Sequence, residues 1–144
     1  MILIKIKNII TEKLKILQNL TKFTNKNDNE SFIRGFTEFA LNHDVDAEIE
    51  TQKRILLENP NNAKAYFNLG ILYYFQGKVD NAIDLYKKAI ETDSNLSDAH
   101  KNLGEIYVAR EQYDLAWKHA KAADMLGNTK LIETLRRYLK EPTA

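Results

Sequence analysis

Hydrophobic and small residues recur along the chain with a period of 34 residues. The clearest instance is a leucine–glycine pair with a tyrosine three positions after the glycine, which begins at Leu69 and again at Leu103. A fixed period of this length is typical of repeat architectures, in which each copy is one supersecondary unit that stacks on the next. The positions that keep the period are Tyr66, Leu69, Gly70 and Tyr73 in one copy and His100, Leu103, Gly104 and Tyr107 in the next.

Each copy is predicted to form two antiparallel helices joined by a short turn. The second half of each copy also keeps the period, and its small residues allow two helices to approach closely. Gly77 offers a helix stop between the two halves of the first copy, and residues 110–112 occupy the same turn one period later. The copies are therefore assigned to residues 63–96 and 97–130, and the matching second-half positions are Ala82, Tyr86 and Ala89, then Ala116, Ala120 and Ala123.

A degenerate third copy is predicted upstream, at residues 29–62. Its two end aromatic positions hold phenylalanine, but a glycine–phenylalanine pair starting at Gly35 stands where leucine and glycine are expected. A proline, Pro60, ends the copy. The positions that we expect to be aromatic or buried are Phe32, Phe39, Ile49, Ile55 and Leu56.

A capping helix is predicted at the downstream end, over residues 131–141. It follows a glycine–asparagine pair that begins at Gly127, and its apolar side chains fall on one face. Terminal repeats of a stack need such a cap because one of their faces would otherwise be bare. The apolar stripe consists of Leu131, Leu135, Tyr138 and Leu139.

Residues 1–26 form a basic amphipathic segment that is predicted to be helical. They carry six lysines and one glutamate, a charge of +5, which leaves −4 for residues 27–144 out of the total of +1. Three roles for the apolar stripe remain open: packing on the repeats of the same chain, dimerisation, and binding to an anionic membrane surface.

The repeat resembles the tetratricopeptide repeat, whose pattern is W-x2-L-G-x2-Y…A-x3-F…P. The copy at residues 63–96 matches that pattern at Tyr66, Leu69, Gly70, Tyr73, Ala82 and Tyr86. It departs from the pattern at its terminal proline, which is Ser94 here and Asn128 in the second copy, and His100 occupies the aromatic position. The resemblance implies an all-α fold: a right-handed α-solenoid of about three helix-turn-helix hairpins, with the N-terminal amphipathic helix and the C-terminal capping helix.

The same resemblance implies a concave groove that is lined by the first helix of each hairpin. The central copy would place an aromatic and apolar patch in this groove, and exposed apolar area of that kind marks a contact site. An alternative is that the phenylalanines of the patch are simply core residues. The expected groove residues are Lys64, Phe67, Asn68, Ile71, Tyr74, Phe75, Lys101, Asn102, Glu105 and Val108.

No constellation for catalysis or for a cofactor is found in the sequence. The chain has no cysteine, and its three histidines, His43, His100 and His119, form neither an i, i+4 pair nor an H-E-x-x-H motif. Its five glycines form no phosphate-binding loop. We therefore expect no catalytic residue, no metal site and no cofactor, and we expect His100 to pack between hairpins.

The net charge and the lengths of the apolar runs limit the kinds of partner that we expect. A net charge of +1 gives no general attraction to nucleic acid, and no run of apolar residues is long enough to span a membrane. The sequence thus predicts a cytoplasmic scaffold that binds an apolar or amphipathic segment of a protein or peptide, with homo-oligomers included among its partners. The alternative is a self-assembling or membrane-peripheral structural protein that uses the N-terminal helix.

Overall fold

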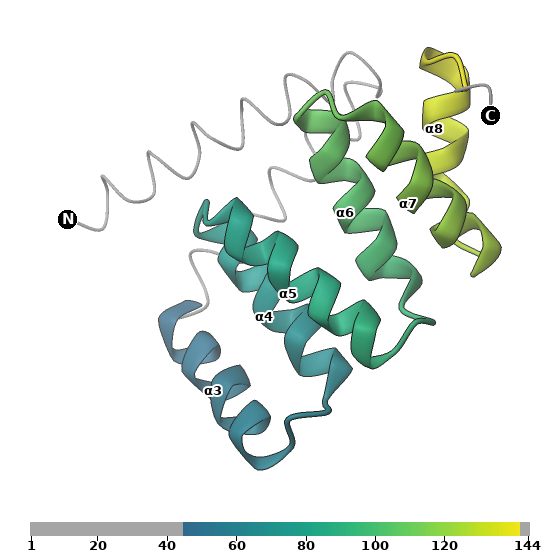
Figure 1. Cartoon of the computed structure of the whole chain (residues 1–144). Helices are drawn as coiled ribbons and strands as arrows, with labels where there is room; N and C mark the ends of the chain where they lie inside the picture. Colours follow the sequence, from purple (N-terminus) through teal and green to yellow (C-terminus); the bar gives the residue numbers. More distant parts are fainter. Residues whose placement is uncertain (1–44, 142–144) are drawn as a thin grey trace.

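The computed structural model describes residues 45–141, which form six α-helices and contain no strand. Each helix lies against the one that follows it, so that the helices stack from α3 to α8 (Figure 1). The all-α helical repeat architecture predicted from the sequence is confirmed. The helices are α3 (Val45–Glu58), α4 (Ala63–Phe75), α5 (Val79–Thr92), α6 (Ser97–Ala109), α7 (Tyr113–Met125) and α8 (Lys130–Tyr138).

Several expectations fall outside the described residues. These are the amphipathic helix of residues 1–26 and the first half of the upstream copy, including Phe32, Gly35 and Phe39. In the part of the chain that is described, none of the helices is long and apolar enough to cross a bilayer.

Two antiparallel hairpins, α4–α5 and α6–α7, form the centre of the stack (Figure 1). Asn62 starts the first hairpin, because its side-chain oxygen accepts a hydrogen bond from the Ala65 backbone N–H at 3.0 Å. The small residues allow close helix packing, as the repeat predicted. A methyl group added at Gly70 would lie only 2.8 Å from the ring of Tyr86. Glycine at this position therefore allows the tyrosine ring of α5 to lie directly against the backbone of α4.

The turns that end α4, α6 and α7 share one backbone geometry. Gly77 and Glu111 lie one period apart and have φ angles of 76° and 59°, and Gly127 has a φ of 87°. In each turn the following backbone N–H bonds to the carbonyl five residues earlier, at 2.8–2.9 Å. This is the Schellman motif, in which glycine is the preferred residue at the left-handed position. The turn at the end of α6 has the same motif, with Glu111 in place of glycine.

Replacing Glu111 by glycine should therefore raise the free energy of unfolding, by about 0.5–1 kcal/mol, because the left-handed backbone is strained for a side-chain-bearing residue. The reverse change one period earlier, Gly77→Ala, should lower it by about 1 kcal/mol. No atom lies within 4 Å of the added methyl group at Gly77, so this loss reflects the backbone and not a clash. Urea unfolding of both variants checks the pair, and changes of the same sign would contradict the shared geometry.

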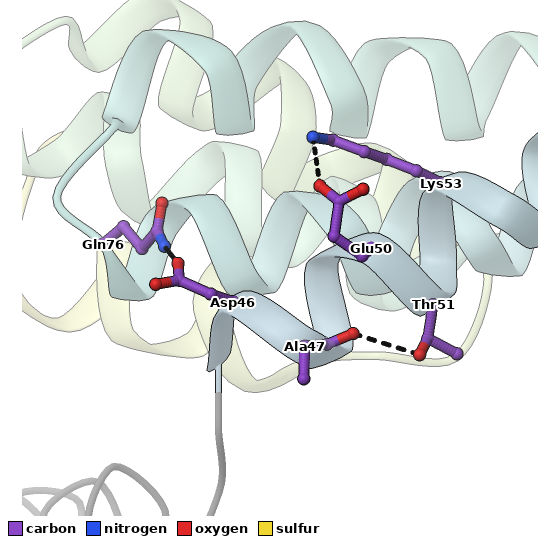
Figure 2. A network of polar contacts seen from close by, with 6 residues as sticks. All are labelled: Asp46, Ala47, Glu50, Thr51, Lys53 and Gln76. Carbon is purple, nitrogen blue, oxygen red and sulfur yellow. Dashed lines mark hydrogen bonds and ion pairs between the residues drawn. The ribbon is translucent and has the colours of Figure 1, made fainter.

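Helix α3 occupies the place of a second hairpin helix in the preceding copy. Gln76 Nε2 donates to Asp46 Oδ1 at 2.6 Å (Figure 2), and Arg110 donates to Asp80 at 2.7 Å. Both members of the second pair lie 34 positions after those of the first. The first turn of α3 thus contacts the end of α4 as the first turn of α5 contacts the end of α6. Figure 2 also shows bonds within α3, from Lys53 to Glu50 and from Thr51 to the Ala47 carbonyl.

Burial along α3 differs in part from the expectation. Ile49 is buried against Leu69 and Leu72 of α4, as expected. Ile55 and Leu56 are only half-buried, and the polar Gln52 is buried instead. The reason is geometric: Gln52 lies one turn after Ile49 on the same helix face, and its amide donates to Glu48 at 2.7 Å.

Helix α8 covers the last hairpin and contacts both α6 and α7. Leu131 and Leu135 are buried, but Tyr138 is 44% exposed and Ile132 takes its place in the core at 1% exposure. The expected stripe is therefore wrong at Tyr138. The helix ends there, and Leu139 has an extended backbone (φ −129°, ψ 144°), so the helical spacing no longer holds at the end of the stripe.

Candidate functional site

The expected groove residues of α4 form a half-buried apolar row. Phe67, Ile71 and Tyr74 lie at helical spacing and pack on the main hydrophobic core from its edge. Asn68 and Phe75 are also half-buried, and Lys64 is exposed. The row therefore combines partial core contact with accessible surface.

The residues of α6 add a polar strip to this surface. Lys101 Nζ lies 3.7 Å from Glu105 Oε1, and the two side chains keep 27% and 41% exposure. The surrounding protein atoms raise the pKa of Glu105 above its ordinary value, an effect that Lys101 partly offsets. Ion pairs of this exposure contribute little to the stability of the fold.

Side-chain interactions join the α4 row to the α6 strip. Tyr74 lies close enough to Glu105 for the carboxylate to raise its pKa, although burial is the larger cause of that rise. Tyr86 of α5 lies between the two helices: its ring centroid is 5.7 Å from that of Phe67. Burial raises the pKa of its hydroxyl group, and the Asn102 side chain lies close enough to offset part of that rise. The structure thus brings residues of both copies together.

Two details of this surface were not expected from the sequence. Val108 is only 2% exposed, so it supports the surface from within and offers no contact area. Tyr86 was assigned only to the repeat pattern, yet its ring packs against Phe67 and its hydroxyl group lies close to Asn102. Tyr86 lies on the second helix of its hairpin. The repeat pattern in the sequence does not show which residues of the first helices its ring contacts, so this role could not be predicted.

A histidine pair lies between α6 and α7. Nδ1 of His100 is 3.0 Å from Nδ1 of His119, so one ring donates a hydrogen bond to the other. The ring of Tyr107 stacks on His119 with a centroid distance of 5.5 Å and an interplanar angle of 20°. The two histidines are 19 residues apart on different helices, which is why a search for i, i+4 pairs did not find them.

The surroundings of the pair favour neutral imidazoles. The pKa of His119 is lowered to about 4, mainly by burial and in smaller part by the nearby His100, Lys118 and Lys87. Burial also lowers the pKa of His100. Neither ring therefore carries a charge at neutral pH.

The stability of the protein should consequently fall as the pH decreases from about 6.5 to about 4. In this window the unfolded His119 binds a proton and the folded one does not, so acid favours unfolding. Because the ring is partly open to solvent, we expect a loss of about 1–2 kcal/mol from this residue. Urea unfolding at pH 7 and pH 4.5 measures it, and His119→Gln should flatten that part of the profile. An equal loss in the variant would assign the effect to other groups.

No group of three or more histidine, cysteine or carboxylate side chains is placed to hold a metal ion within residues 45–141. The two polar pairs described above are Lys101 with Glu105 and His100 with His119. The geometry therefore defines a stack of helical hairpins with a mixed apolar and polar face along the first helices, which is the class of helical repeat proteins.

Comparison with known families agrees with this class. Two sequence profiles described as tetratricopeptide repeat match the chain, one at residues 63–96 and one at residues 85–118. The second match begins within α5 and ends within α7, because a continuous stack of helices can be divided into pairs starting at either helix. Residues 63–118 therefore carry tetratricopeptide repeats.

Solved structures support the same assignment. They include 24 similar chains, so the arrangement is a common one. Among them is the crystal structure of MamA, with a TM-score of 0.58 and 27% sequence identity, over 66% of the present chain and 56% of that chain. The chain thus spans little more than half the length of that structure. No curated protein matches the sequence closely.

Proposed function

We propose that the chain is a protein-interaction scaffold that binds an apolar or amphipathic peptide segment in a concave groove lined by α4 and α6. The observation that carries the proposal is the half-buried row of Phe67, Ile71 and Tyr74, which continues into the polar strip of Lys101 and Glu105. The tetratricopeptide repeats of residues 63–118 support the class of function.

The chemistry of this surface suits an amphipathic helix or an extended apolar segment. An apolar row at helical spacing accepts side chains of a partner at intervals of three and four residues, which is one recurring mode of peptide recognition. The Lys101–Glu105 pair offers one charge of each sign beside that row. Such a rim selects the orientation of a partner more than it adds affinity.

Binding and not catalysis is the proposed activity, and the proposed partner is a protein or peptide in the cytoplasm. Tetratricopeptide repeat proteins are typically non-enzymatic scaffolds. The polar groups around the apolar row are a lysine, a glutamate and two asparagines, Asn68 and Asn102, and these residues recognise backbone and side-chain groups without needing a reaction centre.

A double variant tests the proposal. Phe67→Ala with Tyr74→Ala removes both large rings of the row and should abolish capture of partners by the full-length chain, because the remaining apolar area is too small to hold a segment. Capture is measured by affinity purification with mass spectrometry, and the helical circular dichroism signal should persist.

The matched control is Leu115→Ala with Met125→Ala. These side chains are 39% and 88% exposed on α7, so the control also removes two apolar groups but away from the groove. Partners that are lost equally in both variants, or retained by the groove variant, would refute the groove assignment. A form lacking residues 1–26 separates the alternative, since only self-assembly or membrane binding through that segment requires the deletion to change sedimentation or flotation.

A further inference from the structure

One acidic side chain lies beside the apolar surface of the proposed groove. Glu105 of α6 is close enough to Tyr74 of α4 for its charge to raise the pKa of the tyrosine, and its side chain keeps 41% exposure. Its distance of 3.7 Å from Lys101 Nζ is longer than a hydrogen bond between these groups. Lys101 and Lys130 lower the pKa of Glu105, but the loss of solvation raises it more. The carboxylate would therefore gain from a further cationic group placed closer to it.

The chain itself contains a segment with the complementary pattern. Residues 1–26 lie outside the described residues, and in a helical projection of their sequence Lys13 falls in the middle of the apolar stripe. A charge within an apolar face costs free energy when that face is buried, unless an opposite charge meets it. The stripe therefore needs a surface that is apolar but offers one acidic group. The apolar residues one helical turn before and after this lysine are Ile9, Ile10, Ile16 and Leu17.

We propose that residues 1–26 occupy the groove of their own chain, with their apolar stripe on the α4 row and with Lys13 against Glu105. This inference rests on the groove proposed above and names the segment that fills it. A single charge pair inside an otherwise apolar contact adds little affinity, but it selects one register and one direction of the bound helix. Any other partner of the groove must displace this segment.

The connection between the segment and the stack is long enough for this contact. Residues 27–44 span about 27 Å as a helix and about 60 Å when extended, whereas α4 is about 20 Å long. The described chain also begins beside the groove: Asp46 accepts a hydrogen bond from Gln76, which follows the last turn of α4, at 2.6 Å. The charge of +5 on residues 1–26 is opposite to that of −4 on the remainder, which adds to the attraction. A short link of this kind makes the contact within one chain more favourable than one between copies.

Hydrogen–deuterium exchange of the full-length chain, followed by mass spectrometry of peptic fragments, tests the pairing. The amides of residues 6–20 should be protected in the wild type. Glu105→Lys and Lys13→Glu should each speed their exchange by at least about tenfold, because each change places two like charges in an apolar contact. The double variant exchanges the two charges and should restore most of the protection. Lys15→Glu is the matched control, since Lys15 lies on the opposite, polar side of the projected helix and its reversal should change the exchange little.

Lys13→Glu changes no residue of the helical stack, so its result does not depend on the folding of a groove variant. Protection of residues 6–20 that both single variants retain, or a double variant that restores none of it, would overturn the proposal. Protection that is lost on about hundredfold dilution would also overturn it, because a contact within one chain does not depend on concentration. Absence of protection in the wild type overturns this inference alone. The groove proposal is tested separately by the capture experiment above, since an unprotected segment leaves the groove open to another partner.

Discussion

Tyr86→Ala is expected to lower the free energy of unfolding by about 3–5 kcal/mol, the range for removing a large ring from a packed core. Tyr86 is 1% exposed and lies where α4, α5 and α6 meet. Its ring contacts the backbone of α4 at Gly70 and the ring of Phe67. Loss of the ring leaves a cavity between the two hairpins, which urea unfolding monitored by circular dichroism will measure.

Tyr86→Phe is the matched control for this change. It keeps the ring and removes only the hydroxyl group, which lies close to the Asn102 side chain. The expected cost is at most about 0.5–1.5 kcal/mol, the range for one polar contact. If the phenylalanine variant lost as much stability as the alanine variant, the hydroxyl group and not the packed ring would join the hairpins.

Gly70→Ala is expected to cost about 1–3 kcal/mol, although alanine is the better helix former. The added methyl group would lie 2.8 Å from two ring carbons of Tyr86. A buried aromatic ring between two helices has no free direction in which to move, so α4 and α5 must separate. Differential scanning calorimetry or urea unfolding will show the loss.

The equivalent change one period later, Gly104→Ala, provides the comparison. Its methyl group would meet the end of the Leu131 side chain of α8, and the next neighbour, the Ala116 carbonyl oxygen, lies at 3.4 Å. Because a leucine side chain can change rotamer, we expect a smaller loss here, about 0–1 kcal/mol after the gain in helix propensity. Equal losses at the two glycines would show that Tyr86 does not restrict the approach of α4 and α5.

The repeat period predicted the fold well because the repeated residue types are those that close packing between helices requires. Gly70 stands where a side chain would separate α4 from α5, and at Gly104 an added methyl group would meet the end of the Leu131 side chain. The capping helix was predicted less well at Tyr138, since its burial depends on where α8 ends and not on the apolar spacing. Helix ends are set by local backbone geometry that periodicity does not describe.

The site was predicted in part, for a related reason. Repeat positions identified residues of α4 and α6 that do lie together, such as Tyr74 and Glu105. They did not reveal that Val108 is buried or that His100 meets His119, since both facts depend on the distance between different helices. The spacing of residues in the sequence predicts which side chains share one face of a helix. Contacts between the first and second helices of the hairpins can be identified only from the three-dimensional structure.

The central claim is that the face built by α4 and α6 contacts a polypeptide, and site-specific photo-cross-linking tests it most directly. A benzophenone amino acid at Lys64, an exposed residue of α4 in the proposed groove, is compared with the same amino acid at Lys88 on the exposed face of α5. Contact through this face predicts cross-linked protein from position 64 and little from position 88. Equal cross-linking at both positions, or cross-linking from position 88 alone, would contradict it.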